Sequence, residues 1–460
     1  MRPRGLLLLA LLVPGLAAAQ ASGGAADRDW GRFGYDAARH GASPDATITA
    51  ANVHRLRRLR VQLDGTVDSS PIYVAHGVGG RDAFVVTTTY GKTEAVDAAN
   101  GGVLWRFTPP SYAQLAGTAQ ITNAAPALST DRTAVYAAAP DGTIRKLRLS
   151  DGSVEWATSI TLDPTHEKIT SSLNVSRGLV IATTGGYIGD APPYQGHVVT
   201  LSEATGAIVH VWNSLCSDRS GLLQPSSCDA SDSAIWSRNG AAVDPATGNL
   251  VVATGNAPWN GRTNWGDSTL VLAPDASRLL RHWTPADTRH LNEADLDLGS
   301  TSPGLLAGGY AVQGGKDGKI RLLDLRRLPG ANAKLGGELQ TVPAPGGEMM
   351  FSAPAIWKGT WVFVSTAGGT RAWQLRGGRL HGVWSNGTGG TSPVLAGSLL
   401  YVGGDGMLNV YAPATGKLVA ALPTGGIHWQ SPIVAAGRVA IAEGNANDHA
   451  TSGVLDVYHL

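Results

Sequence analysis

Four side chains of this chain combine types that could do chemistry: an indole (Trp236), a carboxamide (Asn256), a carboxylate (Asp297) and an ammonium group (Lys316). Carboxylate and amide oxygens are ligands that Ca²⁺ prefers, and a carboxylate can take the proton of a hydroxyl group. Each residue also has an ordinary structural explanation. Asn256 and Lys316 lie in turn-like sequences, Asp297 can cap a loop, and Trp236 can lie in the core. The residue types alone leave both interpretations open.

Other familiar catalytic patterns do not stand out in the sequence. His166 is followed by Glu167 but not by a second His four residues on, so the pair does not indicate a zinc protease. No nucleophile elbow, phosphate-binding Gly-Lys-Ser loop, dinucleotide fingerprint or Cys-x-x-Cys-His haem attachment is found. If the protein handles electrons, they must therefore leave through a separate carrier.

The composition narrows the range of partners and predicts a turn-rich fold. The net charge is +1 and only 15% of the residues are charged, without a basic stripe, which argues against a nucleic-acid partner. The 60 Gly and 25 Pro residues suit many tight turns between short strands. Cys216 and Cys228 are the two cysteines, and in an oxidising compartment they predict one disulfide that closes a surface loop.

Eight similar units follow one another along the chain. In each, a short apolar strand opens with a Ser/Ala-x-Pro-like step, and a Gly-rich turn and a second apolar run follow. The units begin near Ser69, Ala124, Ser171, Ala234, Thr301, Ser352, Thr391 and Gln430. A period of about 35–55 residues with several short strands predicts an all-β fold, an eight-bladed β-propeller.

The two ends of the repeat array predict how the ring closes. An alternating strand, residues 56–63, precedes the first unit, and the last unit ends with GVLDVYHL and no further strand. We therefore expect the N-terminal strand to complete the final blade and remove the open sheet edges. Trp105 and Trp156 follow Gly turns at similar spacing, so each is expected to dock on the turn of a neighbouring blade. Residues 165–168, which precede a strand, are expected to face the channel.

The first 21 residues predict a signal peptide, with a basic start, an apolar stretch and small residues at the cleavage site. Residues 22–460 then form a single propeller domain. No later apolar run is long enough to span a bilayer. These features predict a soluble protein of the periplasm or the extracellular space.

The Trp-docking units, the opening DWGRFGYDAARHGASP and the eightfold repeat together resemble the pyrroloquinoline quinone (PQQ) propeller family, which includes the periplasmic quinoprotein alcohol dehydrogenases. The stretch AIWSRNGAAVDPATGNLVVATGNAPWN is similar to the family segment in which a Trp lies under the quinone and an Asn binds calcium. The resemblance thus implies Trp236 as a quinone contact and Asn256 as a calcium ligand. It further implies Asp297 as calcium ligand and catalytic base, and Lys316 as a contact to the quinone oxygens.

Two more quinone contacts are implied, Trp429 as a second ring and Asp68 as an acidic contact. The expected function is that of an exported PQQ- and calcium-dependent dehydrogenase, which oxidises an alcohol or polyol and passes electrons to a separate acceptor. The sequence departs from the family where a Glu ligand of calcium is expected, because Gly186 or Tyr187 stands there and Asp190 is displaced. The alternative is a non-catalytic propeller that serves as a scaffold for envelope proteins.

Overall fold

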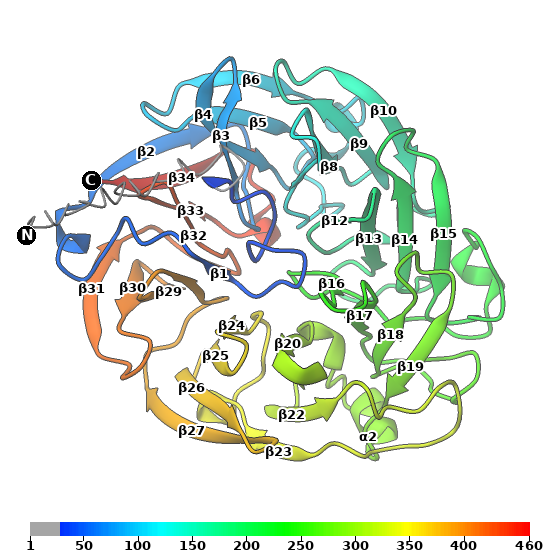
Figure 1. Ribbon diagram of the computed structural model, residues 1–460. Coiled ribbons are helices and arrows are strands. Elements are labelled where there is room, and N and C mark those ends of the chain that lie inside the picture. The colour runs from blue at the N-terminus through cyan, green and yellow to red at the C-terminus, as the bar shows by residue number, and fades with distance from the viewer. Residues whose placement is uncertain (1–27) are drawn as a thin grey trace, which may run out of the picture.

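The computed structural model describes residues 28–460 and shows a closed ring of eight sheets around a central axis (Figure 1). The predicted eight-bladed β-propeller is therefore confirmed. The predicted signal peptide, residues 1–21, lies outside the described residues. Within residues 28–460, no helix has the length and apolar character needed to cross a membrane.

Each blade is a four-stranded antiparallel sheet, and its innermost strand is named first for blades 1 to 8. Blade 1 holds β3 (Ile72–Val78), β4 (Arg81–Thr87), β5 (Thr93–Asp97) and β6 (Val103–Phe107). Blade 2 holds β7 (Ala127–Leu128), β8 (Ala134–Ala138), β9 (Thr143–Arg148) and β10 (Val154–Ser159). Blade 3 holds β12 (Asn174–Ser176), β13 (Leu179–Gly185), β14 (His197–Ser202) and β15 (Ile208–Asn213), with β11 (Lys168–Ile169) also paired to β13. Blade 4 holds β16 (Ala242–Val243), β17 (Leu250–Ala253), β18 (Thr269–Leu272) and β19 (Leu279–Trp283).

The second half of the ring repeats this order. Blade 5 holds β20 (Gly304–Leu306), β21 (Tyr310–Gln313), β22 (Lys319–Asp324) and β23 (Gln340–Pro343). Blade 6 holds β24 (Ala355–Trp357), β25 (Trp361–Thr366), β26 (Gly369–Arg376) and β27 (Arg379–Asn386). Blade 7 holds β28 (Val394–Ala396), β29 (Leu399–Gly404), β30 (Met407–Tyr411) and β31 (Leu418–Pro423), with β1 (Ala42–Ser43) parallel to β28. Blade 8 holds β32 (Ile433–Ala435), β33 (Arg438–Glu443), β34 (Gly453–His459) and β2 (Arg57–Leu63).

Short helices occur only in the connections between these strands, as far as residues 28–460 are concerned. The α-helices are α1 (Tyr112–Leu115) and α2 (Thr288–Glu293). The 3-10 turns are η2 (Val53–Arg55), η3 (Pro225–Ser227), η4 (Leu298–Ser300), η5 (Ala307–Gly309), η6 (Pro345–Gly347) and η7 (Ala446–Asp448).

The ring closes as predicted, through a strand from the N-terminal side of the repeats. β2 pairs antiparallel with β34, with Arg57 opposite His459 and Leu63 opposite Gly453. Blade 8 therefore contains both an early and a late segment of the chain, and every blade has two neighbours. Cys216 and Cys228 form the predicted disulfide in the connection between β15 and β16.

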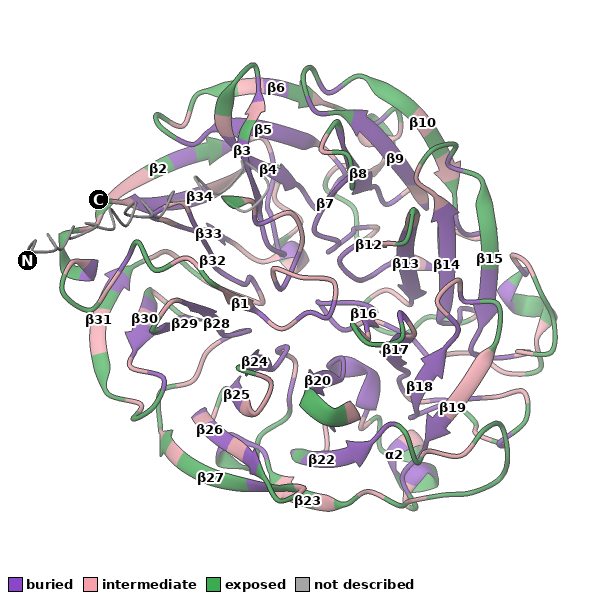
Figure 2. Ribbon diagram, viewed as in Figure 1, coloured by how far each residue is buried: buried purple, intermediate pink, exposed green. Residues whose placement is uncertain are grey.

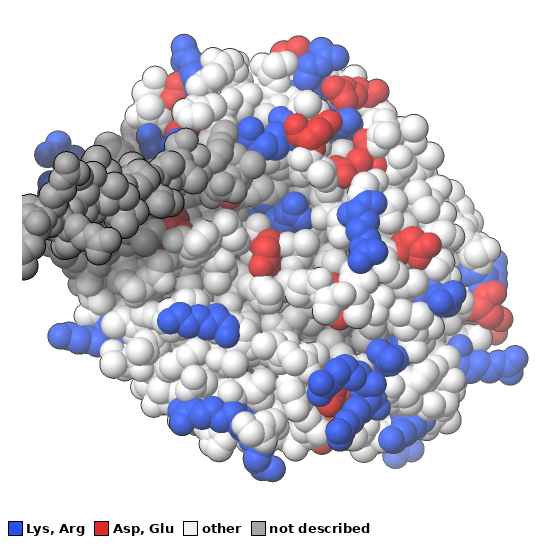
Figure 3. Space-filling view, viewed as in Figure 1, with Lys and Arg blue, Asp and Glu red and all other residues white. Residues whose placement is uncertain are grey.

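The blades pack through their inner and middle strands. Figure 2 shows buried residues along strands such as β8, β9, β13 and β14, whereas exposed residues gather on the outer strands β6, β10 and β27. Trp105 docks on the next blade as expected, because its Nε1 donates to the Leu149 carbonyl at 2.7 Å. A Cβ atom at Gly152 would lie 2.5 Å from the Trp105 ring, so only Gly fits under the indole. On the face seen in Figure 3, basic and acidic side chains are interspersed.

An N-terminal strap, residues 30–43, crosses the middle of the ring and is visible as the dark-blue thread in Figure 1. It exchanges backbone hydrogen bonds with the innermost strands of five blades, through Tyr73, Leu128, Val243, Ile356 and Leu395. The guanidinium group of Arg39 is buried within the strap and donates to the carbonyl oxygens of Phe33, Ser172 and Leu173. The strap therefore covers the axis of the propeller at that end.

Candidate functional site

One register position recurs in all eight blades, and five of its residues line the central cavity. It lies four residues before the innermost strand, as Asp68 lies before Ile72 and Trp429 before Ile433. The eight residues at this position are Asp68, Asn123, Thr170, Arg238, Ser300, Phe351, Gly390 and Trp429. Five of them line a single cavity of about 480 Å³, namely Asn123, Thr170, Arg238, Phe351 and Trp429. No residue of the strap lines this cavity.

The cavity brings together five of the six residues singled out from the sequence. Its lining includes Trp236, Asn256, Asp297, Lys316 and Trp429, which come from blades 4 and 5 and from the connections that lead into blades 4, 5 and 8. Asp68 does not line it, because the side chain is fully buried behind Arg238 and His428. The ring of blades thus brings together residues that are far apart in the sequence.

The acidic end of the cavity consists of Asn256, Asp295, Asp297 and Lys316. The ammonium group of Lys316 lies 2.7 Å from Asp297 Oδ2 and 2.9 Å from Asp295 Oδ1. The other oxygen of Asp297 accepts a hydrogen bond of 2.5 Å from the Asn256 backbone N–H. Burial raises the pKa of Asp297 above its ordinary value, although Lys316 acts in the opposite direction. This end therefore holds a buried carboxylate whose charge is locally compensated.

A further buried carboxylate, Asp267, lies behind Asp297 and was not recognised in the sequence. Its Oδ1 accepts from the Leu298 backbone N–H at 3.2 Å, and its Oδ2 has no hydrogen-bond partner among residues 28–460. Burial raises the pKa of Asp267 well above its ordinary value, and the nearby Asp297 adds to the effect. Asp267 carries a positive φ of 46° in a loop, and no sequence motif marks it.

Three aromatic rings form one continuous surface in the cavity. Phe351 stacks on Trp429 with a centroid distance of 5.4 Å and an interplanar angle of 18°. Trp236 meets Trp429 at 6.3 Å and 53°. The two indoles meet at an angle and do not face each other across a slot, so a flat ligand can lie against either ring. Phe351 is the aromatic residue that the sequence patterns missed.

The basic end of the cavity consists of Asn123, Lys168 and Arg238. The Arg238 guanidinium lies 4.3 Å from the Trp429 ring centroid, and its Nη2 lies 3.8 Å from Asp68 Oδ2. The same Asp68 oxygen pairs with His428 Nδ1 at 2.7 Å. Burial opposes the charge of Asp68, yet Arg238 and the His428 hydrogen bond hold its pKa below the ordinary value. Asp68 therefore supports the cavity wall from behind.

Lys168 in β11 lines the basic end without a partner of its own. Within residues 28–460, no side chain forms a hydrogen bond or an ion pair with its ammonium group. Burial, together with the charge of Arg238, lowers the pKa of Lys168 to about 7, and Asp68 acts in the opposite direction. Lys168 belongs to the segment expected at the channel, and the structure does place it there.

The residues suit a flat polyanion better than they suit a metal ion. A planar acid such as PQQ would meet an aromatic surface and three cationic side chains, Lys168, Arg238 and Lys316. For calcium the donor set is incomplete: no group of three His, Cys, Asp or Glu side chains within residues 28–460 could hold a metal ion. At Gly186 a Cβ atom would lie 2.6 Å from the Tyr194 ring, so this aromatic ring occupies the adjoining space.

Comparisons with known proteins agree with the geometry. A family model described as outer membrane protein assembly factor BamB matches residues 52–222. A quinohemoprotein alcohol dehydrogenase, ADH IIB of Pseudomonas putida, is 27% identical over 361 residues, which cover 69% of this chain and 50% of the relative. The chain thus spans about half the length of this curated relative.

Solved structures share the fold at low sequence identity. The quinohemoprotein alcohol dehydrogenase of Comamonas testosteroni superposes with a TM-score of 0.71 at 17% identity, covering 94% of this chain and 80% of that one. A europium-containing methanol dehydrogenase gives 0.69 at 16% identity, covering 94% and 98%.

The eight four-stranded blades define an eight-bladed β-propeller. Residues 52–222 match the BamB family model, and the chain is similar in sequence to a quinohemoprotein alcohol dehydrogenase.

Proposed function

We propose that this protein is an exported dehydrogenase of the PQQ family that binds the quinone in the axial cavity and oxidises an alcohol or a polyol. One observation carries the proposal. Trp236, Asn256, Asp297 and Lys316, which a resemblance had selected from separate parts of the chain, line the same cavity. A set of unrelated turn and core residues would have no reason to converge in this way.

In this proposal, Trp236 and Trp429 support the quinone ring, and Lys316 balances its oxygens. Bound PQQ supplies an electrophilic carbonyl that accepts hydride from the substrate carbon. Asp297 is the group that takes the hydroxyl proton, since its raised pKa suits a general base. Asn256 and Asp297 are the residues that would hold calcium, and Asp190, which lines the same cavity, is the nearest replacement for the missing Glu. Electrons then leave to a separate acceptor.

The test is a titration of the purified protein with PQQ, with and without Ca²⁺, followed by tryptophan fluorescence and quinone absorbance. Saturable quenching is expected, because Trp236 and Trp429 lie in the cavity wall. Quenching that is the same with a chelator present would remove calcium from the proposal. An absence of binding at high micromolar PQQ would overturn the dehydrogenase function.

The second candidate function is a scaffold for envelope proteins. The description of the matching family model favours it, as does the Tyr194 ring beside Gly186. A protein that fails to bind PQQ but retains defined envelope partners in a crosslinked pull-down would support this function. Binding of PQQ with alcohol-dependent dye reduction would exclude a purely structural role.

A further inference from the structure

The charged side chains at the acidic end of the cavity are paired with one another, whereas the basic end contains a lysine without an ion-pair partner within residues 28–460. At the acidic end, Lys316 lies between Asp295 and Asp297, so two carboxylates surround one ammonium group. At the basic end, Arg238 shares the single buried carboxylate of Asp68 with His428. Lys168 has no carboxylate partner at all within the described part of the chain. The basic end therefore offers positive charge to whatever enters the cavity.

Two buried polar atoms beside Lys168 also lack partners. Arg238 Nε and Asn123 Oδ1 form no hydrogen bond within residues 28–460, although both residues are at least nine-tenths buried. The amide of Asn123 is oriented because its Nδ2 donates to Asp68 Oδ2 at 3.3 Å, which leaves Oδ1 as the unsatisfied atom. Buried polar groups normally find a partner, so these atoms call for a ligand with both an acceptor and a donor. The ring of Trp429 under Arg238 adds a flat surface.

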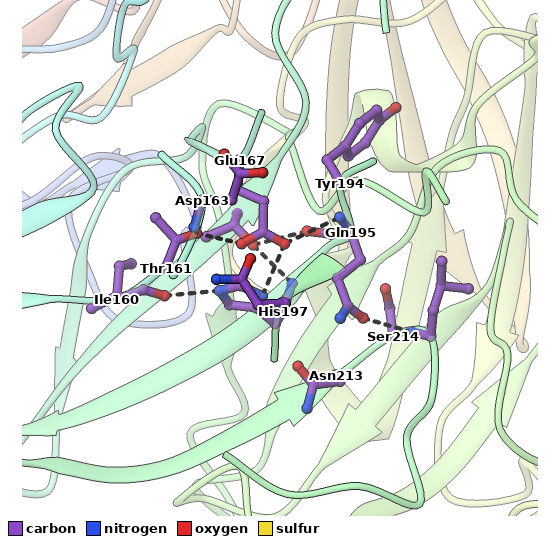
Figure 4. A network of polar contacts seen from close by, with 12 residues as sticks. Ile160, Thr161, Asp163, Glu167, Tyr194, Gln195, His197, Asn213 and Ser214 are labelled. Atoms are coloured by element: carbon purple, nitrogen blue, oxygen red, sulfur yellow. Dashed lines mark hydrogen bonds and ion pairs between the residues drawn. The ribbon is translucent and has the colours of Figure 1, made fainter. Parts of the chain in front are cut away.

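A network of polar contacts surrounds Glu167, the residue before Lys168 (Figure 4). The neighbouring Glu167 is fully buried and accepts hydrogen bonds from the Thr161 hydroxyl and from the Gln195 backbone N–H. His197 lies below it, with Nδ1 3.8 Å from Glu167 Oε1. Glu167 immediately precedes β11, so its anchoring in this network fixes the start of the strand that carries Lys168.

From these contacts we infer that Lys168, Arg238 and Asn123 form a carboxylate subsite for a ligand that carries an N–H or O–H group next to its acid group. The side chains of Lys168 and Arg238 bind the carboxylate of the ligand, and the N–H or O–H group of the ligand donates a hydrogen bond to Asn123 Oδ1. Two sources share this chemistry: a heteroaromatic acid, as in the quinone itself, and a 2-hydroxy acid substrate. The first source rests on the proposed function, whereas the second does not.

The experiment compares wild-type protein with Lys168→Met and with Lys417→Met, an exposed lysine that changes the net charge equally. Binding is measured by calorimetry and tryptophan fluorescence at about pH 6 for PQQ, pyrrole-2-carboxylate and lactate. The methyl esters of the two small acids serve as uncharged controls. Loss of a charge-assisted hydrogen bond should weaken acid binding about 10- to 100-fold in Lys168→Met and leave Lys417→Met unchanged.

Each pattern of results has one meaning. Weaker binding of PQQ and pyrrole-2-carboxylate in Lys168→Met, with competition between the two, supports the subsite and assigns it to the quinone. Unchanged PQQ binding with weaker lactate binding to the PQQ-loaded variant supports the subsite and assigns it to an acidic substrate. Binding of the small acids without any binding of PQQ keeps the subsite and overturns the proposed dehydrogenase. If wild type binds none of the acids, or if Lys168→Met binds all of them as wild type does, the subsite is overturned.

Discussion

The two ends of the axial cavity solve the problem of buried charge in different ways. At the acidic end, a buried carboxylate and a lysine neutralise each other at 2.7 Å, and the exposed Asp295 adds a second contact. At the basic end, the counter-charge lies behind the wall in Asp68, which forms an ion pair with Arg238 but none with Lys168. The basic end takes Asn123 and Arg238 from the recurring register position, whereas the acidic end is built from residues outside it.

This contrast separates the roles of the two ends. A carboxylate that is paired with a lysine, such as Asp297 with Lys316, can take up a proton when a ligand displaces the lysine. This property suits a group that transfers protons. A lysine without a counter-ion is ready to receive an anion, which suits a group that recognises a ligand. The acidic end is thus arranged for chemistry and the basic end for binding.

The largest expected effect comes from breaking the acidic end. Asp297→Asn removes the charge with almost no change in shape, so alcohol-dependent dye reduction by the PQQ-loaded protein should fall by about 10²–10⁴-fold. The matched control is Asp295→Asn, which also contacts Lys316 but has a side chain that is 60% exposed. Turnover in the control should stay close to wild type. Equal losses in the two variants, or no loss in Asp297→Asn, would remove Asp297 from the mechanism.

At the basic end, the largest expected effect of a substitution is on the stability of the protein. Arg238→Met removes the guanidinium partner of the buried Asp68, so the free energy of unfolding should drop by about 3–5 kcal/mol. Denaturant unfolding measures this loss. The double variant Arg238→Met/Asp68→Asn should lose less than the sum of the single variants, because the uncompensated charge is gone. Additive losses would show that the two side chains are not coupled.

The smallest expected effect is a change with pH in the affinity of the basic end for a carboxylate ligand. Because the pKa of Lys168 is lowered to about 7, its ammonium form is present below this pH and is lost above it. A carboxylate ligand should therefore bind about tenfold more tightly at pH 6 than at pH 8, as long as binding keeps the lysine protonated. Arg238 and Asp68 face Lys168 and keep their charges over this range, and His428 contacts Asp68.

The variant Lys168→Arg keeps a permanent positive charge and leaves His428 untouched, so its affinity should hardly change between the same two pH values. A pH dependence that persists in Lys168→Arg would trace the effect to His428 and not to Lys168.

The fold followed from the sequence because its signals are repeated. Eight units with similar turns define the blades, and the unpaired strand at residues 56–63 had a vacant place in blade 8. Docking of Trp105 was visible for the same reason. Trp384, which docks on Gly416 of the next blade, was missed because a single copy with irregular spacing carries little signal.

The site was only half visible in the sequence. The acidic end emerged through resemblance, because Asn256 and Asp297 lie in stretches like those of the family. Arg238 was overlooked although it lies two residues after Trp236, since a lone arginine in a connection has no chemical signature. It becomes conspicuous when the blades are aligned on their innermost strands, where it occupies the position of Asp68 and Trp429. Charge compensation, which sets the two ends apart, depends on distances that a sequence does not contain.

The closure of blade 8 also orders events during biosynthesis. β2 is translated before all of blades 1 to 7, but its partner β34 is translated after them. The cavity wall likewise joins Asn123, near the start of the ring, to Trp429, near its end. A nascent chain can build blades 1 to 7 one after another, yet it has no complete cavity until residues 429–459 have left the ribosome. Ligand loading therefore follows the closure of blade 8, and the compartment in which this blade closes decides which ligands the protein first meets.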